Sequence, residues 1–391
     1  MINKRTKVLF LPAWYPSSSN RVLGIFVKQH ALALNDSVTL AVFHVCPDQG
    51  GRKRPRFEKA VEDDLIVYRN HFYQFKFKLL RPLNWLTYFY SLILGYFRVV
   101  RDFGHPDINH VHVLTRVGVV ALIANFIFKT PYCISEHWSR YLPARNSYHG
   151  ILRKALTSFI VKRSRGISTV SQSLKNAMQS HFIDHPNFMI IPNTVNFNLF
   201  HGRANEISGK EFQFLHVSGL TDSTKNVSGI IKAFYILKNE GTCVNLNLVG
   251  NCTHQQDLKD LVRDLYLEDS IRFLGELHGT ELVAAYQEAN AFVLFSFFEN
   301  QPCVLLEAFS VGIPVVATNV GGIAEIVNKE NGLLTPPGDY KRLAERMKDL
   351  IRDKERFDPT VIRAQAELHF GYPAVRDRFV KFYSKSLKGS Y

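Results

Sequence analysis

The stretch AFVLFSFFENQPCVLLEAFSVGIPVVAT, residues 291–318, holds the pattern that decides the fold. Its first five residues are apolar or aromatic, and it closes on PVVAT; both segments are typical of buried strands. Pro302 suits the first turn of an intervening helix, and Gly312 suits the residue just after its end. The stretch therefore predicts a strand, a helix over Val304–Val311 and a second strand, which is the repeating unit of a parallel sheet.

The same alternation of short apolar runs and longer amphipathic segments continues outward along the chain. A polar stretch near residues 201–210 divides it into two series. Two doubly wound parallel-sheet domains in tandem, an α/β fold, are therefore expected. The expected strands are residues 7–12, 38–45, 108–114, 131–137, 166–171, 188–193, 212–219, 244–250 and 271–275. The expected helices are residues 24–35, 117–128, 172–182, 227–239, 254–266 and 280–288.

The composition is consistent with two domains, and the net charge differs between the two halves of the chain. The 391 residues are 46% hydrophobic, enough for two cores. Residues 1–200 carry a net charge of +16 and residues 201–391 a net charge of −2. A field of that size favours an anionic partner for the first half, although a merely soluble basic surface is the open alternative. The five scattered cysteines lack the close Cys/His spacings of a zinc site and are typical of a reduced, cytosolic protein.

Two apolar segments of the first half raise the question of a membrane. Residues 7–12 follow a basic start, but no small-residue cleavage site comes after them, so we expect a strand rather than a signal peptide. Residues 75–103 contain an apolar, aromatic core that is flanked by Lys76, Arg81 and Arg101. That core is shorter than the roughly 20 residues of a spanning helix. It fits either a helix lying in the lipid headgroup region or an ordinary buried helix.

The two glutamates of the opening stretch point to a ligand. In doubly wound sheets ligands bind outside the carboxyl ends of the strands, and Glu299 follows such an end. The amides around Cys303 and Val304 would form a helix N-terminus suited to a diphosphate. Glu307, one turn into that helix, is placed to accept from ribose hydroxyls, and Glu299 from hydroxyls of the group that the diphosphate carries.

The residues from Phe298 to Gly322 resemble the glutamate-pair signature of glycosyltransferase family 4, retaining sugar-nucleotide enzymes of the GT-B fold. Further family motifs follow in the family's order along nearly the whole chain. They are AWYPSSSNRVLGIFVKQHALAL, ISEHW, TVSQSL, IIPNTVN, the Lys225-Asn226 pair, LVGN, IRFLGEL and NGLLTPPGD. A lone glutamate pair is weak evidence, whereas the ordered set is specific.

The resemblance implies a role for each matching position. Glu299, His137 and Lys225 would act on the donor sugar and its diphosphate as positioning and electrostatic groups, and no residue stands out as a covalent nucleophile or a base. Glu307 would bind the ribose. The resemblance implies further donor-binding positions. They are Gly24 in the loop over the phosphates, Gly219 in the loop before Lys225, Arg272 and Phe273 near the nucleobase, and Gln301, Pro302, Cys303, Val304 and Leu305 at the helix N-terminus.

One departure from the family pattern concerns the leaving-group site. The family usually carries an arginine five positions before its lysine, but here Leu220 stands there, with no arginine between His216 and Lys225. A loop one residue longer would put Ser218 or Gly219 at that place. Either way one cation is missing, and Arg21 or Arg140 is the candidate to supply it.

The resemblance implies a domain plan and a mechanism. Residues 1–198 would bind the acceptor, residues 199–372 the nucleotide-sugar donor, and residues 373–391 would form a helix that crosses back to the first domain. The sequence has no Asp-X-Asp, so we expect no metal and no cofactor besides the co-substrate, a UDP- or GDP-sugar. The family's retention is commonly described as front-face attack, in which the leaving phosphate helps to deprotonate the acceptor hydroxyl.

The expected protein is a cytoplasmic, peripherally membrane-bound glycosyltransferase of bacterial surface polysaccharide synthesis, such as lipopolysaccharide or capsule. Its partners would be a glycan or lipid-linked acceptor and an anionic membrane, and not a nucleic acid. A sugar-nucleotide epimerase of the same fold is the first alternative. The second is a non-catalytic basic protein that binds membrane or nucleic acid. Donor base, sugar, linkage and oligomeric state stay open at this point.

Overall fold

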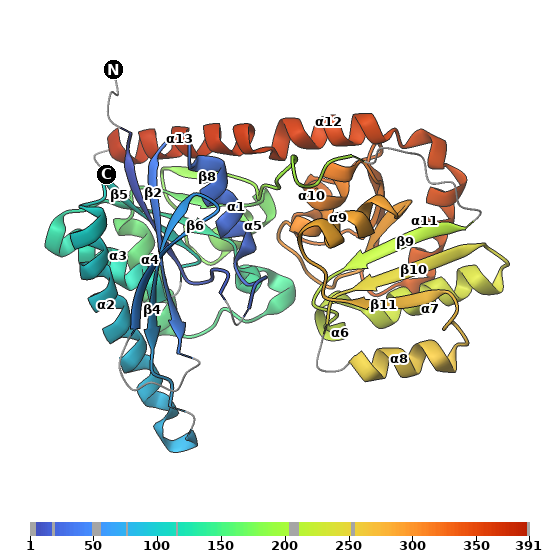
Figure 1. Ribbon diagram of the computed structural model, residues 1–391, viewed down its shortest axis with the longest axis horizontal. Helices are drawn as coiled ribbons and strands as arrows, with labels where there is room; N and C mark the ends of the chain where they lie inside the picture. Colours follow the sequence, from blue (N-terminus) through green and yellow to red (C-terminus); the bar gives the residue numbers. More distant parts are fainter. Residues whose placement is uncertain are drawn as a thin grey trace.

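The computed structural model describes residues 5–388 apart from 18–19, 49–55, 76, 115, 203–210 and 252–254. Lys76 of the basic aromatic segment and His254, where a helix was expected to begin, lie outside the described residues. The chain forms two α/β lobes, and its last helices run along one side of both (Figure 1).

The N-terminal lobe is built on an eight-stranded sheet of order β3-β4-β2-β1-β5-β6-β7-β8. Neighbouring strands pair in parallel, except for the antiparallel pair β3–β4. The strands are β1 (Lys7–Pro12), β2 (Thr39–Pro47), β3 (Arg56–Glu62), β4 (Leu65–Phe72), β5 (Ile108–His112), β6 (Tyr132–Glu136), β7 (Ile167–Thr169) and β8 (Phe188–Ile190). Strands β1, β5 and β6 are buried almost throughout, which explains their continuous apolar runs.

Helices cover this sheet and position the loops at its carboxyl edge. Helix α2 packs against β2 and β4, and α3 packs against β5. The helices of this lobe are α1 (Ile25–Leu34), α2 (Asn84–Phe103), α3 (Arg116–Phe128), α4 (Ile151–Arg163) and α5 (Gln172–Ser180), with the short 3-10 helices η1 (Lys78–Leu83), η2 (Ser139–Tyr141) and η3 (Pro143–Arg145). Among the described residues no helix combines the length and the apolar character that crossing a bilayer requires.

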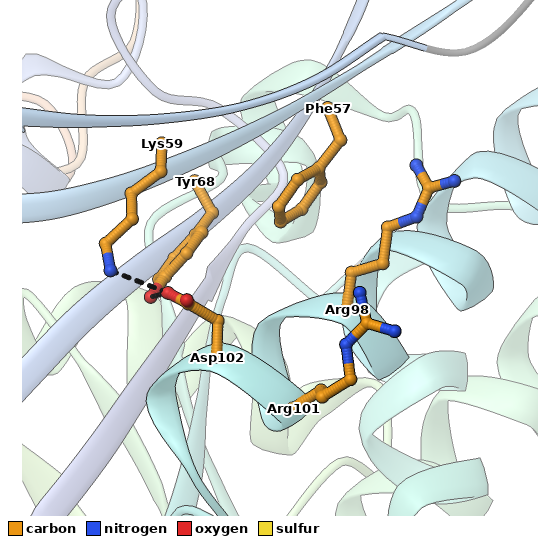
Figure 2. A pocket seen from close by; sticks show the side chains of 6 residues that line it. All are labelled: Phe57, Lys59, Tyr68, Arg98, Arg101 and Asp102. Atoms are coloured by element: carbon orange, nitrogen blue, oxygen red, sulfur yellow. Dashed lines mark hydrogen bonds and ion pairs between the residues drawn. The ribbon is translucent and has the colours of Figure 1, made fainter.

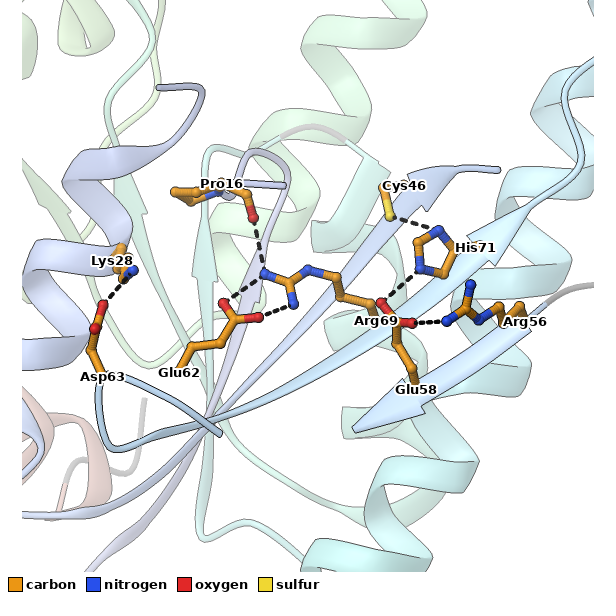
Figure 3. A network of polar contacts seen from close by, with 9 residues as sticks. All are labelled: Pro16, Lys28, Cys46, Arg56, Glu58, Glu62, Asp63, Arg69 and His71. Carbon is orange, nitrogen blue, oxygen red and sulfur yellow. Dashed lines mark hydrogen bonds and ion pairs between the residues drawn. The ribbon is translucent and has the colours of Figure 1, made fainter. Parts of the chain in front are cut away.

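The β3–β4 hairpin is an edge feature that the strand and helix alternation did not predict. Asp63 and Asp64, at its turn, have φ of 47° and 64°. Two consecutive positive φ values are the mark of a type I′ turn, which aspartate tolerates. The Arg69 guanidinium on β4 then pairs with both carboxylate oxygens of Glu62 and donates to the carbonyl of Pro16 at 3.1 Å (Figure 3). This network ties the hairpin to the loop that follows β1.

The C-terminal lobe is built on a six-stranded, all-parallel sheet of order β11-β10-β9-β12-β13-β14. Its strands are β9 (Phe212–Val217), β10 (Val244–Val249), β11 (Ile271–Gly275), β12 (Ala291–Leu294), β13 (Val315–Thr318) and β14 (Gly332–Thr335). Its helices are α6 (Asp222–Lys225), α7 (Val227–Asn239), α8 (Gln255–Asp264), α9 (Gly279–Gln287), α10 (Cys303–Val311) and α11 (Tyr340–Arg352), with η4 (Ile323–Glu325) and η5 (Lys354–Arg356). The opening stretch is thus β12, α10 and β13.

The last two helices join the lobes. Helix α12 (Pro359–Phe370) packs on α10, and α13 (Tyr372–Lys388) packs on α1 of the other lobe (Figure 1). Phe379 and Phe382 of α13 are fully buried in a cluster with residues of β1, β2 and α1. His110 Nδ1 lies 2.7 Å from Tyr383 Oη. The end of the chain therefore completes the core of the N-terminal lobe.

Candidate active site

The loop between β12 and α10 lies where the two lobes touch. Asn300 Nδ2 donates to the carbonyl of His137, on the N-terminal lobe, at 2.6 Å. The backbone N–H of Asn193 donates to Gln301 Oε1 at 2.5 Å, and its side-chain amide donates to the Gln301 carbonyl at 2.8 Å. The side chain of Gln301 is therefore occupied by the contact between lobes. The glutamate stretch borders the cleft between them.

Two of the expected site residues, Lys225 and Glu299, meet in this loop. Lys225 Nζ forms an ion pair with Glu299 Oε1, and Ser296 Oγ donates to the same oxygen at 2.8 Å. The N–H of Phe297 donates to the Thr224 carbonyl at 3.0 Å, so the β12 loop is fixed to α6. The two side chains are only 26% and 12% exposed. A cation and a carboxylate therefore lie side by side, both largely shielded from solvent.

The N-terminus of α10 opens beside this pair. Pro302 is its N-cap residue and has no side-chain oxygen, and no acidic residue stands in the first turn. The Leu305 N–H already bonds the Pro302 carbonyl at 3.2 Å. A helix N-terminus carries partial positive charge and donors for an anion. Cys303 and Val304, whose amides head this helix, are each partly exposed.

Glu307 lies one turn further into α10 and is held by a tyrosine. Tyr286 of α9 donates its hydroxyl to Glu307 Oε2 at 2.8 Å and lies 3.2 Å from the Val304 carbonyl. Burial raises the pKa of Glu307 to about 7, and the Tyr286 hydrogen bond acts in the opposite direction. The carboxylate therefore changes charge near neutral pH. Tyr286 was not anticipated from the sequence.

Nucleotide affinity should consequently depend on pH through Glu307. An ionised carboxylate accepts hydroxyl hydrogen bonds about twice as strongly as a neutral one. Raising the pH from 6 to 8 should tighten binding of a nucleotide sugar roughly fivefold, because Glu307 loses its proton in that interval. Calorimetric titration at several pH values checks this, with Glu307→Gln as the variant that should lose the dependence. The same slope in both proteins would contradict the assignment.

The glycine pair after β13 explains how the loop fits. A Cβ on Gly321, whose φ is 54°, would lie 1.6 Å from the Glu299 carbonyl oxygen. A Cβ on Gly322 would lie 2.1 Å from the Asn300 carbonyl and 2.7 Å from Ser171 Cβ of the other lobe. No side chain fits at either place, so the pair lets the glutamate loop pass against its neighbour.

His137 enters the cleft region from the N-terminal lobe. It follows β6, and its ring lies 4.4 Å from that of Phe26 on α1. The preceding residue, Glu136, is buried and accepts the N–H groups of Leu114, His137 and Trp138 at 2.9 Å each. Glu136 therefore fixes the backbone turn that presents His137. Its role depends on burial and could not be inferred from its place in the sequence alone.

The position of the missing arginine contributes no cation to the site. Leu220 has φ of 46° and is fully buried in the core of the C-terminal lobe. Arg140 lies with its guanidinium carbon 3.2 Å from the centre of the Trp138 ring, and burial lowers its pKa. Arg21 is exposed in the loop before α1. Both candidate replacements come from the N-terminal lobe, and the structure brings neither into a hydrogen bond with Glu299.

The remaining candidate positions are spread along the lobes. Gly24 has φ of 76° and directly precedes α1, and a Cβ there would lie 2.3 Å from the Trp14 carbonyl oxygen. Gly219 is exposed in the turn between β9 and α6. Arg272 is exposed and Phe273 partly buried on β11, an edge strand. These positions belong to loops and edges around the sheet ends rather than to the Lys225–Glu299 cluster.

One carboxylate that accepts hydrogen bonds from the opposite lobe was not predicted from the sequence. Glu325, in η4, accepts the backbone N–H groups of Gln172 and Ser173 at 2.7 Å each. These two amides head α5 of the N-terminal lobe, so the carboxylate caps a helix of the opposite lobe. No local pattern reveals such a cap, because donor and acceptor are about 150 residues apart.

A pocket of about 340 Å³ lies elsewhere, between the β3–β4 hairpin and the end of α2. Lys59, Arg98 and Arg101 surround it, and Asp102 accepts from Lys59 Nζ at 2.6 Å and from Tyr68 Oη at 2.5 Å (Figure 2). None of its lining residues belongs to the expected donor site.

Two parallel-sheet lobes facing across a cleft, with the last helix returning to the first lobe, define the GT-B class of glycosyltransferases. Family models match both lobes: "Glycosyltransferase Family 4" over residues 24–199 and "Glycosyl transferases group 1" over residues 200–365. The chain belongs to glycosyltransferase family 4.

Several known proteins are similar to the chain. Glycogen synthase of Mycobacterium tuberculosis is 27% identical over 253 residues, 63% of this chain and 61% of that protein. The O-antigen chain mannosyltransferase RfbU of Salmonella typhimurium is 28% identical over 274 residues, 69% and 71% of the two chains. The crystal structure of Anabaena Alr3699/HepE in complex with UDP has a TM-score of 0.73 at 20% identity and covers 97% of this chain and 100% of that one. The match spans about three fifths of the length of the glycogen synthase.

Proposed function

We propose that this protein is a retaining glycosyltransferase that moves a sugar from a nucleotide-diphosphate sugar, UDP- or GDP-linked, to a hydroxyl of a glycan or lipid-linked acceptor. The observation that carries the proposal is that three features gather around Cys303 at the start of α10: the Lys225–Glu299 pair, the helix N-terminus and Glu307. A cation, helix amides and two carboxylates are the groups that a diphosphate, a sugar and a ribose need.

In this mechanism the protein stabilises the leaving group. The bond between the anomeric carbon and the diphosphate oxygen breaks, the acceptor oxygen bonds that carbon from the same face, and the acceptor proton passes to the leaving phosphate. Lys225 leaves Glu299 to meet the charge that develops on the diphosphate, together with the amides of α10. Glu299 is then free to accept from the sugar hydroxyls. Because these groups supply the positive charge, we propose that no metal ion is required.

Bacterial surface polysaccharide assembly is the pathway that we propose. The support is the similarity to an O-antigen chain mannosyltransferase, together with the +16 net charge of residues 1–200. A growing glycan on a lipid diphosphate carrier at the cytoplasmic face of the membrane would be attracted to such a lobe. No nucleic acid is part of this proposal.

The test is a transfer assay with purified protein in the presence of a chelator. We expect release of nucleoside diphosphate only when an acceptor is present, and an NMR spectrum of the product that retains the anomeric configuration of the donor. Release or isomerisation without an acceptor would support the sugar-nucleotide epimerase instead. Binding to anionic vesicles with no affinity for any nucleotide would support the non-catalytic alternative.

Membrane attachment is proposed through the start of α2. Phe77, Leu79, Trp85 and Tyr90 are 72%, 81%, 56% and 61% exposed. They lie on η1 and the first turns of α2, which extend below the body of the N-terminal lobe (Figure 1). Lys78 and Arg81 lie among them, and this mixture of aromatic, aliphatic and cationic side chains suits an anionic lipid surface.

Vesicle sedimentation tests this attachment. The double variant Leu79→Ser, Trp85→Ser should bind phosphatidylglycerol vesicles at least about tenfold more weakly than the wild type, because each lost side chain removes on the order of 1.5–3 kcal/mol of burial in lipid. Leu368→Ser, at a 67% exposed position of α12, serves as the matched control and should bind like the wild type. Equal binding by all three proteins would contradict the proposed contact.

A further inference from the structure

Beside the cleft, three histidines from separate elements of the N-terminal lobe converge. His30 lies on α1, His112 ends β5 and His137 follows β6. One ring nitrogen from each lies within 4.8 Å of one from each of the other two, and the ring centres are 5.4 to 6.1 Å apart. This cluster, called here the histidine triad, includes one residue of the expected donor site and two that the sequence analysis had not assigned to it.

The histidine triad carries unused ring nitrogens. His30 Nε2 lies 3.0 Å from the Pro192 carbonyl, which can only accept, so this nitrogen carries the proton and Nδ1 carries the bare lone pair. His30 Nδ1 and His112 Nε2 are buried without a hydrogen-bond partner among the described residues. The His137 side chain has Asn193 as a hydrogen-bonding neighbour. Buried polar atoms normally have partners, and an unpartnered one can mark the place of a bound water or ion.

The geometry suits a tetrahedral cation. Zn–N bonds of about 2.0–2.1 Å place two tetrahedral nitrogen ligands about 3.3 Å apart. His112 Nδ1 and His137 Nε2 lie 3.4 Å apart, long for a hydrogen bond and close to that ligand spacing. These two nitrogens and His30 Nδ1 are therefore the candidate ligands, and the unpartnered His112 Nε2 would carry the proton of that ring. The bond from His30 to a backbone carbonyl is the arrangement by which outer groups orient metal-bound histidines.

The surroundings of the histidine triad are largely apolar. The rings of Phe10, Phe26 and Phe379 lie 4.3 to 4.9 Å from a ring of the histidine triad. These three rings form an apolar shell around the imidazoles of the histidine triad. His137 as a whole is partly exposed, so the cluster is open on one side.

We propose that the histidine triad binds a zinc-type divalent cation and that the bound ion inhibits sugar transfer. Three imidazoles with an open fourth position are a known zinc ligand set. The ion would hold His137 by its ring and so withdraw it from the donor sugar. This second part rests on the proposed function, whereas the binding itself does not.

Zinc titration of chelator-treated protein against a chromophoric zinc indicator tests the binding. We expect one tightly bound Zn²⁺ per chain, and His30→Gln and His112→Gln should each weaken it more than about 100-fold, since loss of an outer partner alone costs 10- to 100-fold. His185→Gln is the matched control, because both ring nitrogens of that histidine are hydrogen-bonded, to Ser164 and Asn187. It should bind zinc like the wild type.

Two further measurements keep the outcome clear. Circular dichroism and thermal unfolding in chelator establish that each variant is folded, and Co²⁺ added to the wild type alone should give the visible absorption of a tetrahedral site. Absence of stoichiometric zinc and of that spectrum would overturn the proposal, as would equal affinity in His30→Gln and the wild type. Nucleotide binding measured in chelator reports on the proposed function separately.

Discussion

Lys225→Ala is expected to lower kcat about 100- to 1000-fold, the usual loss when one preorganised group that stabilises developing charge is removed. Lys225 forms an ion pair with Glu299, and its charge acts on Cys303, the first residue of α10. Leu220, at the place where the family has an arginine, is buried and cannot share the task. Steady-state kinetics with donor and acceptor measure the loss.

Lys232→Ala is the matched control for this experiment. Lys232 lies on α7, soon after Lys225, and its Nζ lies 6.0 Å from the Tyr340 ring, so it leaves the cleft untouched. It should keep kcat within about twofold, because surface changes away from a site have small effects. Thermal unfolding of Lys225→Ala separates lost catalysis from a loss of folding caused by the unpaired Glu299. Near-normal kcat in a folded Lys225→Ala protein would contradict the assigned role.

Phe379→Ala should lower the free energy of unfolding by about 3–5 kcal/mol, as other large-to-small changes at buried phenylalanines do. Phe379 is fully buried in the cluster that α13 shares with the N-terminal lobe, and its ring lies 4.9 Å from that of His30. For a lobe of about 200 residues this is a fall in Tm on the order of 10 °C. Scanning calorimetry measures the change.

Leu387→Ala, on the same helix at a 42% exposed position, is the control and should leave Tm nearly unchanged. The comparison asks whether the last helix belongs energetically to the first lobe. Equal melting of Phe379→Ala and Leu387→Ala would mean that α13 contributes little to that core.

The sequence was sufficient for those parts of the fold that repeat. Strands buried on both faces, such as β1 and β12, are continuous apolar runs, and α10 lies between a proline and a glycine, so these elements could be predicted. The β3–β4 hairpin could not, because its strand β3 alternates exposed and half-buried residues and its turn uses two aspartates instead of a glycine.

The candidate site also contains residues that could be predicted from the sequence and residues that could not. Glu299 and Glu307 were predicted because they stand close to a strand end and a helix start that the pattern locates, whereas Lys225 was predicted only because its position matches a family motif. Tyr286 and Glu136 were missed, since their roles come from hydrogen bonds made only after folding.

Histidines show the same limit. No functional role was assigned to His110 or His112 from the sequence. His110 lies within hydrogen-bonding distance of Tyr383 and Ser135, at 2.7 and 2.8 Å. His112 Nδ1 lies 3.4 Å from His137 Nε2, and His112 Nε2 has no partner among the described residues. Alternation along β5 cannot distinguish the two, because both are completely buried.

The central claim is that the glutamate loop binds a nucleotide diphosphate, and calorimetric titration with UDP, GDP and ADP tests it most directly. The wild type should bind one of the three selectively, and Glu307→Ala should weaken that binding about 10- to 100-fold, the value of hydrogen bonds to a charged acceptor. Glu281→Ala, at an exposed position of α9, should bind like the wild type. Binding of no nucleotide, or binding that Glu307→Ala leaves unchanged, would contradict the account.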